Sequence, residues 1–156
     1  MIHTPEAEAV TQLILEVFRL NGQLLDAGDR LTKPLGLTSA RWQVLGAIDL
    51  AGQPLTVPQI GRRMGVSRQA VQRVANDLEA AGFVAFKDNP DHARAKLVAL
   101  TKKGQDSMDR VGARHIEWSN ELADGMEAGR LTAAVEMLRE LRLRCEQVEI
   151  TNKPGR

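Results

Sequence analysis

The sequence predicts a mainly α fold of the α+β class, in which a small central lobe is joined to long N- and C-terminal helices. Near both ends of the 156-residue chain, apolar residues recur every three or four positions, which is typical of amphipathic helices. The middle of the chain combines shorter helical patterns with two short runs of β-branched and aromatic residues. We therefore expect residues 1–156 to form a single architecture, with a lobe at 38–100 and flanking helices at 6–33 and 101–150.

The first expected helix carries an apolar stripe from Val10 to Leu31, at alternating spacings of three and four residues. Pro34 and Gly36 should end this helix, because proline lacks the backbone N–H that a helix interior requires. Thr38 is placed to cap a second helix with its side-chain oxygen. The first two helices are therefore separated by a short turn.

A capping box predicts the start of the third helix, since Thr56 and Gln59 have its three-residue spacing. This helix should end at Met64, because Gly65 can adopt the positive φ of a tight turn. Ser67 can then cap a fourth helix, which has one small apolar face and one polar face. The third and fourth helices are therefore expected to form a closely joined pair.

The runs FVAFK (83–87) and KLVAL (96–100) predict a β-hairpin, with the turn-rich segment DNPDHARA between them. Thr101 should cap a fifth helix, and a sixth helix follows with an apolar stripe from Leu131 to Val148. Cys145 falls on this last stripe, where we expect a small buried hydrophobe rather than a redox sensor.

The first, fifth and sixth helices have apolar faces that a lobe of roughly 65 residues cannot cover by itself. A second copy of the chain is the simplest partner, because a symmetric homodimer buries the same face of both copies. These helices are therefore expected to be dimerisation helices.

The segment IGRRMGVSRQAV (60–71) fits a helix-turn-helix, in which the second helix can lie in the major groove of DNA. Gly61 is small where the two helices must cross, while Met64 and Val66 are apolar where the turn must be anchored. The hairpin after the fourth helix predicts the winged form, whose basic loop can reach the adjacent minor groove. The alternative is a merely solvated helix surface, since arginine and glutamine are common on exposed helices.

Charge in the lobe is positive although the net charge of the chain is only +1. The interval between Asp49 and Asp77 contains four arginines and no acidic residue, which favours phosphate. Arginine and glutamine can also form bidentate hydrogen bonds with guanine and adenine, and a helix N-terminus favours a phosphate oxygen. We expect nine side chains to contact DNA: Arg62, Ser67, Arg68, Gln69, Gln72, Arg73, Asn76, Arg94 and Lys96.

Three segments resemble the MarR (multiple antibiotic resistance regulator) family of bacterial transcription factors: LTSARWQVLGAI (37–48), LTVPQIGRRMGVSRQAVQRVANDLEAAGFV (55–84) and RAKLVALTKKG (94–104). The resemblance implies an obligate homodimer, built by its N- and C-terminal helices, that binds a pseudo-palindromic operator in double-stranded DNA. Such a protein is most often a repressor, and a small-molecule effector usually releases it. The resemblance also implies that Arg94 is the minor-groove contact of the wing. The family often has an aspartate two residues earlier, where this chain has His92 preceded by Asp91.

Arg41 and Trp42 resemble the wall of the cleft in which family members bind effectors. His115, beside Trp118 on the fifth helix, could donate a hydrogen bond to such a ligand. Packing is the alternative, because Trp42 has the spacing of a core residue and His115 also suits a packed or dimer-interface position.

The sequence argues against an enzyme, because it has no nucleophile paired with a base, no glycine-rich phosphate loop and no readable carboxylate pair. Its three histidines are scattered, so neither a metal nor another cofactor is expected. No apolar run approaches the ~18 residues of a membrane span, and no leader pattern is visible, so we expect a cytoplasmic protein. The alternative function is a protein-interaction module on a degenerate winged fold that does not bind DNA.

Overall fold

The computed structural model describes residues 3–92 and 94–148, which divide into two compact units. The first unit, Met1–Ile116, holds the N-terminal helix, the lobe and most of the fifth helix, and the second unit, Glu117–Arg156, holds the remainder. The predicted mainly helical α+β fold is confirmed. The last two residues of the predicted C-terminal helical segment, 149 and 150, lie outside the described residues, as do both ends of the predicted range 1–156.

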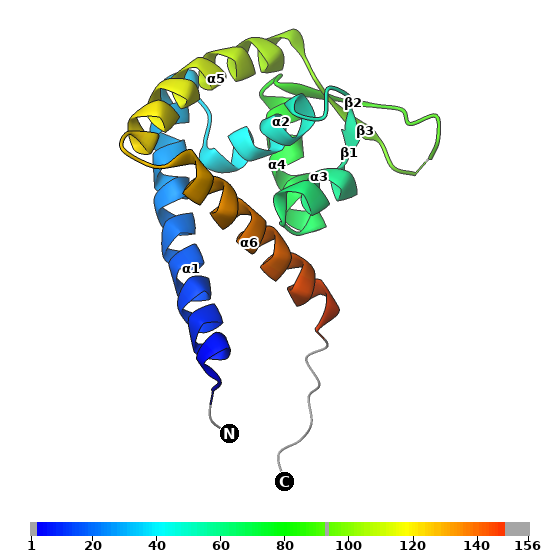
Figure 1. The fold of residues 1–156 in the computed structure, drawn as a ribbon. Helices are drawn as coiled ribbons and strands as arrows, with labels where there is room; N and C mark the ends of the chain where they lie inside the picture. The colour runs from blue at the N-terminus through cyan, green and yellow to red at the C-terminus, as the bar shows by residue number, and fades with distance from the viewer. Residues whose placement is uncertain (1–2, 93, 149–156) are drawn as a thin grey trace. The chain divides into compact units, whose positions relative to one another are not determined.

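The elements follow the predicted order, with an additional short strand and an additional 3-10 helix (Figure 1). Their bounds are α1 Pro5–Thr32, the 3-10 helix η1 Lys33–Leu35, α2 Ser39–Asp49, β1 Leu55–Thr56, α3 Val57–Met64, α4 Arg68–Ala80, β2 Val84–Lys87, β3 Leu97–Leu100, α5 Lys102–Ala123 and α6 Ala128–Gln147. Among the described helices, none combines the length and the apolar composition that crossing a bilayer requires.

Helix α1 is joined to the lobe by hydrogen bonds at its C-terminal end. The buried hydroxyl of Thr32 donates to the backbone oxygens of Gly28 and Leu37, at 2.8 and 3.2 Å. The carboxylate of Asp29 accepts from the backbone N–H of Ser39 at 2.6 Å, which satisfies one free donor at the start of α2. The lobe is therefore held to the end of α1 through polar contacts on the turn.

The predicted caps of the lobe helices are confirmed. Thr38 and Ser67 accept hydrogen bonds from backbone N–H groups in the first turns of α2 and α4. Both hydrogen bonds of the capping box between Thr56 and Gln59 are present at the start of α3. These side chains satisfy N–H groups that a helix leaves unpaired at its N-terminus, so each helix begins where its cap lies.

The sheet is antiparallel, with β3 in the centre and β1 and β2 at its edges. Leu55 of β1 pairs with Val98, and Phe86 of β2 pairs with the same residue from the other side. The sequence does not predict strand β1, because a segment of two residues is too short to show an alternating pattern. In Figure 1, the loop between β2 and β3 extends away from α2, α3 and α4 as a wing.

The hydrophobic core lies where α2, α3 and α4 pack on the sheet and on the first turns of α5. Its fully buried large side chains come from all of these elements: Leu45, Ile60, Val71, Leu78, Val84, Val98 and Val111. Each buried aliphatic side chain contributes about 1.5–3 kcal/mol through the removal of apolar surface from water. The lobe is therefore a rigid support for the exposed face of α4.

At Gly104, α5 lies close to the backbone of Phe83, the residue before β2. A Cβ atom at this position would lie 2.1 Å from the backbone oxygen of Phe83, whereas a Cβ at Gly112 would meet no atom within 4 Å. We expect Gly104→Ala to destabilise the protein by roughly 1–3 kcal/mol, because backbone atoms must shift. Gly112→Ala should instead stabilise it by about 0.5–1 kcal/mol, because alanine favours the helix. Urea denaturation of both variants checks this, and equal effects would contradict the close packing.

Large apolar side chains are exposed on α1 and α6. They include Val10, Val17, Phe18, Leu20 and Leu24 on α1, and Leu131, Val135, Met137, Leu138 and Leu143 on α6. Within the described residues, α6 buries none of its side chains. The prediction that Cys145 is buried is therefore wrong for the single chain, where this side chain is exposed.

Candidate nucleic-acid interface

The turn between α3 and α4 is only three residues long. Gly65 adopts a left-handed conformation with φ of 66°, and both its N–H and that of Val66 donate to the backbone oxygen of Gly61. This conformation strains residues that carry a Cβ, so glycine suits the position. Ser67 then caps α4, and the second helix starts in a new direction directly after the turn.

Gly61 allows α3 to approach the start of α4 closely. A Cβ atom at this position would lie 2.9 Å from the backbone oxygen of Val66 and 3.8 Å from a methyl group of Val71. Any larger side chain would push the turn away from α3. The sequence expectation that the two helices cross at Gly61 therefore agrees with the geometry.

Helix α4 separates its apolar and polar residues onto two faces. Val71, Ala75 and Leu78 are buried in the core. The opposite face carries five of the predicted contact residues of this helix, with only Gln72 half-buried: Arg68, Gln69, Gln72, Arg73 and Asn76. The core residues hold the helix in place, and the polar side chains remain available to a partner.

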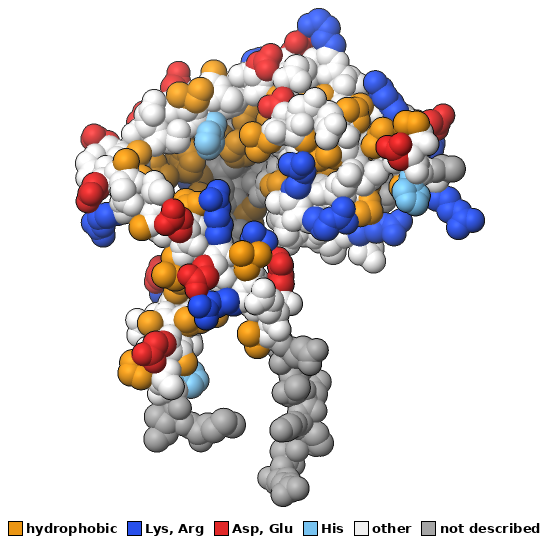
Figure 2. Space-filling view, turned by 45° about the vertical axis from the view of Figure 1, so that its right-hand side comes forward, with side chains coloured by type: hydrophobic (Ala, Val, Ile, Leu, Met, Phe, Trp, Pro, Cys, Tyr) orange, Lys and Arg blue, Asp and Glu red, His pale blue; other side chains and the backbone are white. Residues whose placement is uncertain are grey.

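The arginines of α3 and α4 are exposed and have no acidic neighbour in the sequence interval 50–76. Among the described residues, none of the ion pairs involves Arg62, Arg63, Arg68 or Arg73. Figure 2 shows Lys and Arg side chains gathered on the part of the lobe from which the wing extends. Exposed guanidinium groups without internal partners are suited to bind phosphate oxygens or base edges.

The wing loop is closed by Asn89. Its side-chain amide donates to the backbone oxygen of Ala95 at 3.0 Å, and its carbonyl oxygen accepts from the backbone N–H of Asp91 at 3.0 Å. Arg94 and Lys96 are exposed on this loop. Within the described residues, no ion pair holds Arg94, so Asp91 does not take over the role of the aspartate that the family often has.

One further contact joins the hairpin to α4. The carboxylate of Glu79 on α4 accepts from the backbone N–H of Phe86 on β2 at 3.3 Å. The wing loop and the start of α3 also line one hollow of about 620 Å³, whose walls include Pro58, Arg62 and His92.

The predicted effector residues are only partly brought together. Trp42 and His115 have ring centroids 5.5 Å apart, and both line a largely apolar cavity of about 380 Å³ between α2 and α5. The other walls are formed by Gln43, Gly46, Ala47, Asp49, Leu50, Met64, Met108 and Gly112. Arg41 is half-buried but does not line this cavity, and Trp118 belongs to the second unit.

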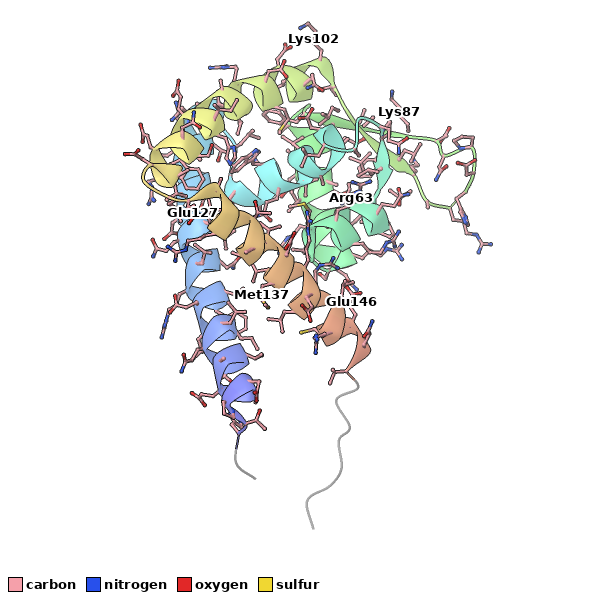
Figure 3. All side chains as sticks on the ribbon, viewed as in Figure 1. Arg63, Lys87, Lys102, Glu127, Met137 and Glu146 are labelled. Atoms are coloured by element: carbon pink, nitrogen blue, oxygen red, sulfur yellow. The ribbon has the colours of Figure 1, made fainter. Side chains whose placement is uncertain are left out.

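Sequence reasoning missed three residues of this surface. Arg63 lies on α3 and Lys87 at the end of β2, and both are exposed cations (Figure 3). The acid-free interval signalled Arg63, whereas Lys87 and the loop-closing role of Asn89 depend on the fold of the hairpin. In the described part of the chain, no group of three or more His, Cys, Asp or Glu side chains could hold a metal ion.

Comparisons with known proteins agree with this architecture. A model described as MarR family matches residues 35–95. An uncharacterized protein of Mycobacterium tuberculosis, Rv2011c, is 38% identical over 135 residues, covering 86% of this chain and 93% of the relative.

Two solved structures share the fold. MosR of Mycobacterium tuberculosis, in complex with DNA, has a TM-score of 0.70 and 24% identity, covering 85% of this chain and 96% of that chain. CouR of Rhodococcus jostii RHA1, bound to p-coumaroyl-CoA, has a TM-score of 0.74 and 21% identity, covering 83% and 90%.

Proposed function

This chain belongs to the MarR family of winged helix-turn-helix transcriptional regulators, and we propose from that membership that it is a homodimeric repressor that binds a pseudo-palindromic operator in DNA. The observation that carries the proposal is the exposed face of α4, where Arg68 and Arg73 have no ion-pair partner among the described residues and lie beside amide side chains. The matched family and the solved structures of similar fold support a regulator, because those structures are of MarR family transcriptional regulators.

Helix α4 enters the major groove in this proposal. Arg68, Gln72 and Arg73 then face base edges, because residues near the N-terminus of a recognition helix lie deepest in the groove. The N-terminus of α4, capped by Ser67, favours a phosphate oxygen through its free N–H groups. The exposed Arg94 of the wing reaches toward the adjacent minor groove, whose negative potential attracts arginine.

Two copies of the chain are needed to read a pseudo-palindrome. The exposed apolar side chains of α1 and α6 support a dimer, because a C2 interface buries the same surface of each copy. The two α4 helices then meet half-sites about 34 Å apart, one turn of the duplex. That MosR was solved with DNA supports this use of the shared fold.

The cavity beside Trp42 and His115 is our candidate for the effector site. Its walls are mainly apolar, and Asp49 supplies a carboxylate. A ligand bound between α2 and α5 would displace α2. The displacement would also move α3 and α4, which pack against α2. The CoA ester bound to CouR supports effector binding on this fold. Trp42→Ala should abolish release by an effector found with the wild type, as fluorescence anisotropy of labelled DNA can measure.

Arg73 and Arg62 should differ in what they recognise. Arg73→Ala should weaken operator binding by roughly 1–3 kcal/mol while leaving random DNA less affected, because a bidentate base contact is lost. Arg62→Ala should weaken both alike, because a phosphate contact carries no sequence information. Competition between operator and random duplexes measures the ratio.

The matched control is Arg110→Ala, which removes an exposed arginine of α5 outside the helix-turn-helix. This variant should leave both affinities close to those of the wild type. Equal losses of specificity in the Arg73 and Arg62 variants would reject the division of roles between them.

A further inference from the structure

One hydrogen bond on the exposed face of α4 joins two side chains that are both candidates for DNA contact. The amide nitrogen Nε2 of Gln72 donates to Oδ1 of Asn76 at 2.8 Å, across one helical turn. Gln72 is half-buried while Asn76 is exposed, so the bond lies along the surface of the helix. Among the described residues of α4, this is the one side-chain pair joined in this way.

The hydrogen bond with Asn76 leaves some polar groups of the Gln72 amide without a partner in this pair. An amide NH2 group has two hydrogens, and the contact with Asn76 uses one of them. The other N–H and the carbonyl oxygen Oε1 remain, which are the donor and acceptor that glutamine offers to N7 and N6 of adenine. By count, the contact with Asn76 therefore leaves Gln72 one donor and one acceptor for a base.

The position of Asn76 along the helix also separates the roles of the two residues. Asn76 lies about 6 Å further along the helix axis than Gln72, and about 12 Å beyond Arg68. Base contacts in a helix-turn-helix come mainly from the N-terminal part of the recognition helix. Gln72 is therefore in the part that reads bases, and Asn76 is in the following turn, behind it.

We propose that Asn76 is a positioning residue that holds the amide of Gln72 ready for one base pair in each half-site, with adenine as the preferred partner. This inference rests on the proposed function. A glutamine side chain that is free to rotate must lose that freedom on binding, which weakens the contact. Asn76 restricts the rotation in the free protein, so that the correct base gains the full benefit of two aligned hydrogen bonds.

The test compares base preference at every position of the operator for the wild type, four variants of α4 and one control variant of α1. Asn76→Ala should reduce the preference at the Gln72 position by about threefold to tenfold, since one rotamer-rich side chain is no longer held. Gln72→Ala should abolish the preference at that same position. The double variant should equal Gln72→Ala, because Asn76 acts only through Gln72.

Asn76→Asp separates positioning from a general loss of binding. Its carboxylate still accepts the hydrogen bond from Gln72, so the base preference should be retained. Its negative charge should lower affinity for all sequences alike, because it repels phosphate. The control Gln12→Ala removes an amide from a comparable pair on α1, whose Nε2 donates to Glu8, and should leave the base preference unchanged.

Nuclear magnetic resonance of the free protein gives a readout that does not depend on DNA. The side-chain NH2 group of Gln72 should be ordered in the wild type and more mobile in Asn76→Ala. Equal mobility in the two proteins would overturn the inference. So would an effect of Asn76→Ala at a base position different from that of Gln72, because Asn76 would then read a base itself. A wild type that selects no sequence would instead overturn the proposed function, and this inference with it.

Discussion

The affinity of the protein for its operator should fall on the order of a thousandfold or more when salt rises from about 50 to about 200 mM, if each dimer neutralises roughly 6–10 phosphates. The physical reason is that binding releases cations condensed on the duplex, and this release gains less entropy as the bulk salt concentration rises. The unpaired arginines of α3 and α4 supply the positive charges. Titration of labelled duplex at several salt concentrations gives the slope of log affinity against log salt.

Single variants show how much each side chain contributes to the slope of log affinity against log salt. Arg62→Ala should reduce its magnitude by about one per protomer, because one phosphate contact is lost. Arg110→Ala should leave it unchanged, since Arg110 lies on α5. Binding that is indifferent to salt would mean that phosphate contacts contribute little, and would contradict the assignment of this surface.

Leu20→Asp should convert the proposed dimer to a monomer at micromolar concentration and remove tight operator binding. Leu20 belongs to the apolar stripe of α1 and is 54% exposed in the single chain. An unpaired carboxylate in an apolar interface costs several kcal/mol, and C2 symmetry introduces it twice, so the dissociation constant of the dimer should rise about a thousandfold or more. Sedimentation equilibrium measures this constant directly.

Leu50→Asp is the matched control for that substitution. Leu50 is 86% exposed at the C-terminal end of α2 and belongs to neither of the apolar stripes of α1 and α6. The same change of side chain should therefore leave the protein dimeric. If both variants remained dimeric, the dimer would have to use another surface.

Local signals explain why the helices of the lobe were predictable. The caps Thr38, Thr56 and Ser67 accept hydrogen bonds from N–H groups three residues later, and Gly65 adopts the positive φ of its own turn. These features can be predicted because each depends only on residues that are close in the sequence. Strand β1 is different, because Leu55 pairs with Val98, which is distant in the sequence. Two residues carry no pattern of their own, and only the folded hairpin gives them a partner.

The sequence predicts the features of the site that follow from residue composition and from the face of a helix. It does not predict features that depend on individual side-chain contacts. The absence of acidic residues around Arg68 and Arg73 can be read from the sequence, and the exposed face of α4 agrees with it. The bonds from Asn89 across the wing and from Gln72 to Asn76 depend on side-chain rotamers that no spacing specifies. Burial of Cys145 was expected from its stripe alone, although a stripe does not say what covers it.

The most direct measurement is to select fragments of the source genome with the purified protein and then determine how many chains each retarded duplex carries. The account predicts a pseudo-palindromic fragment bound by two chains, and loss of retardation when Arg68 and Arg73 are both replaced by alanine. Protein that remains monomeric and retards no genomic duplex, even in dilute buffer, would contradict it.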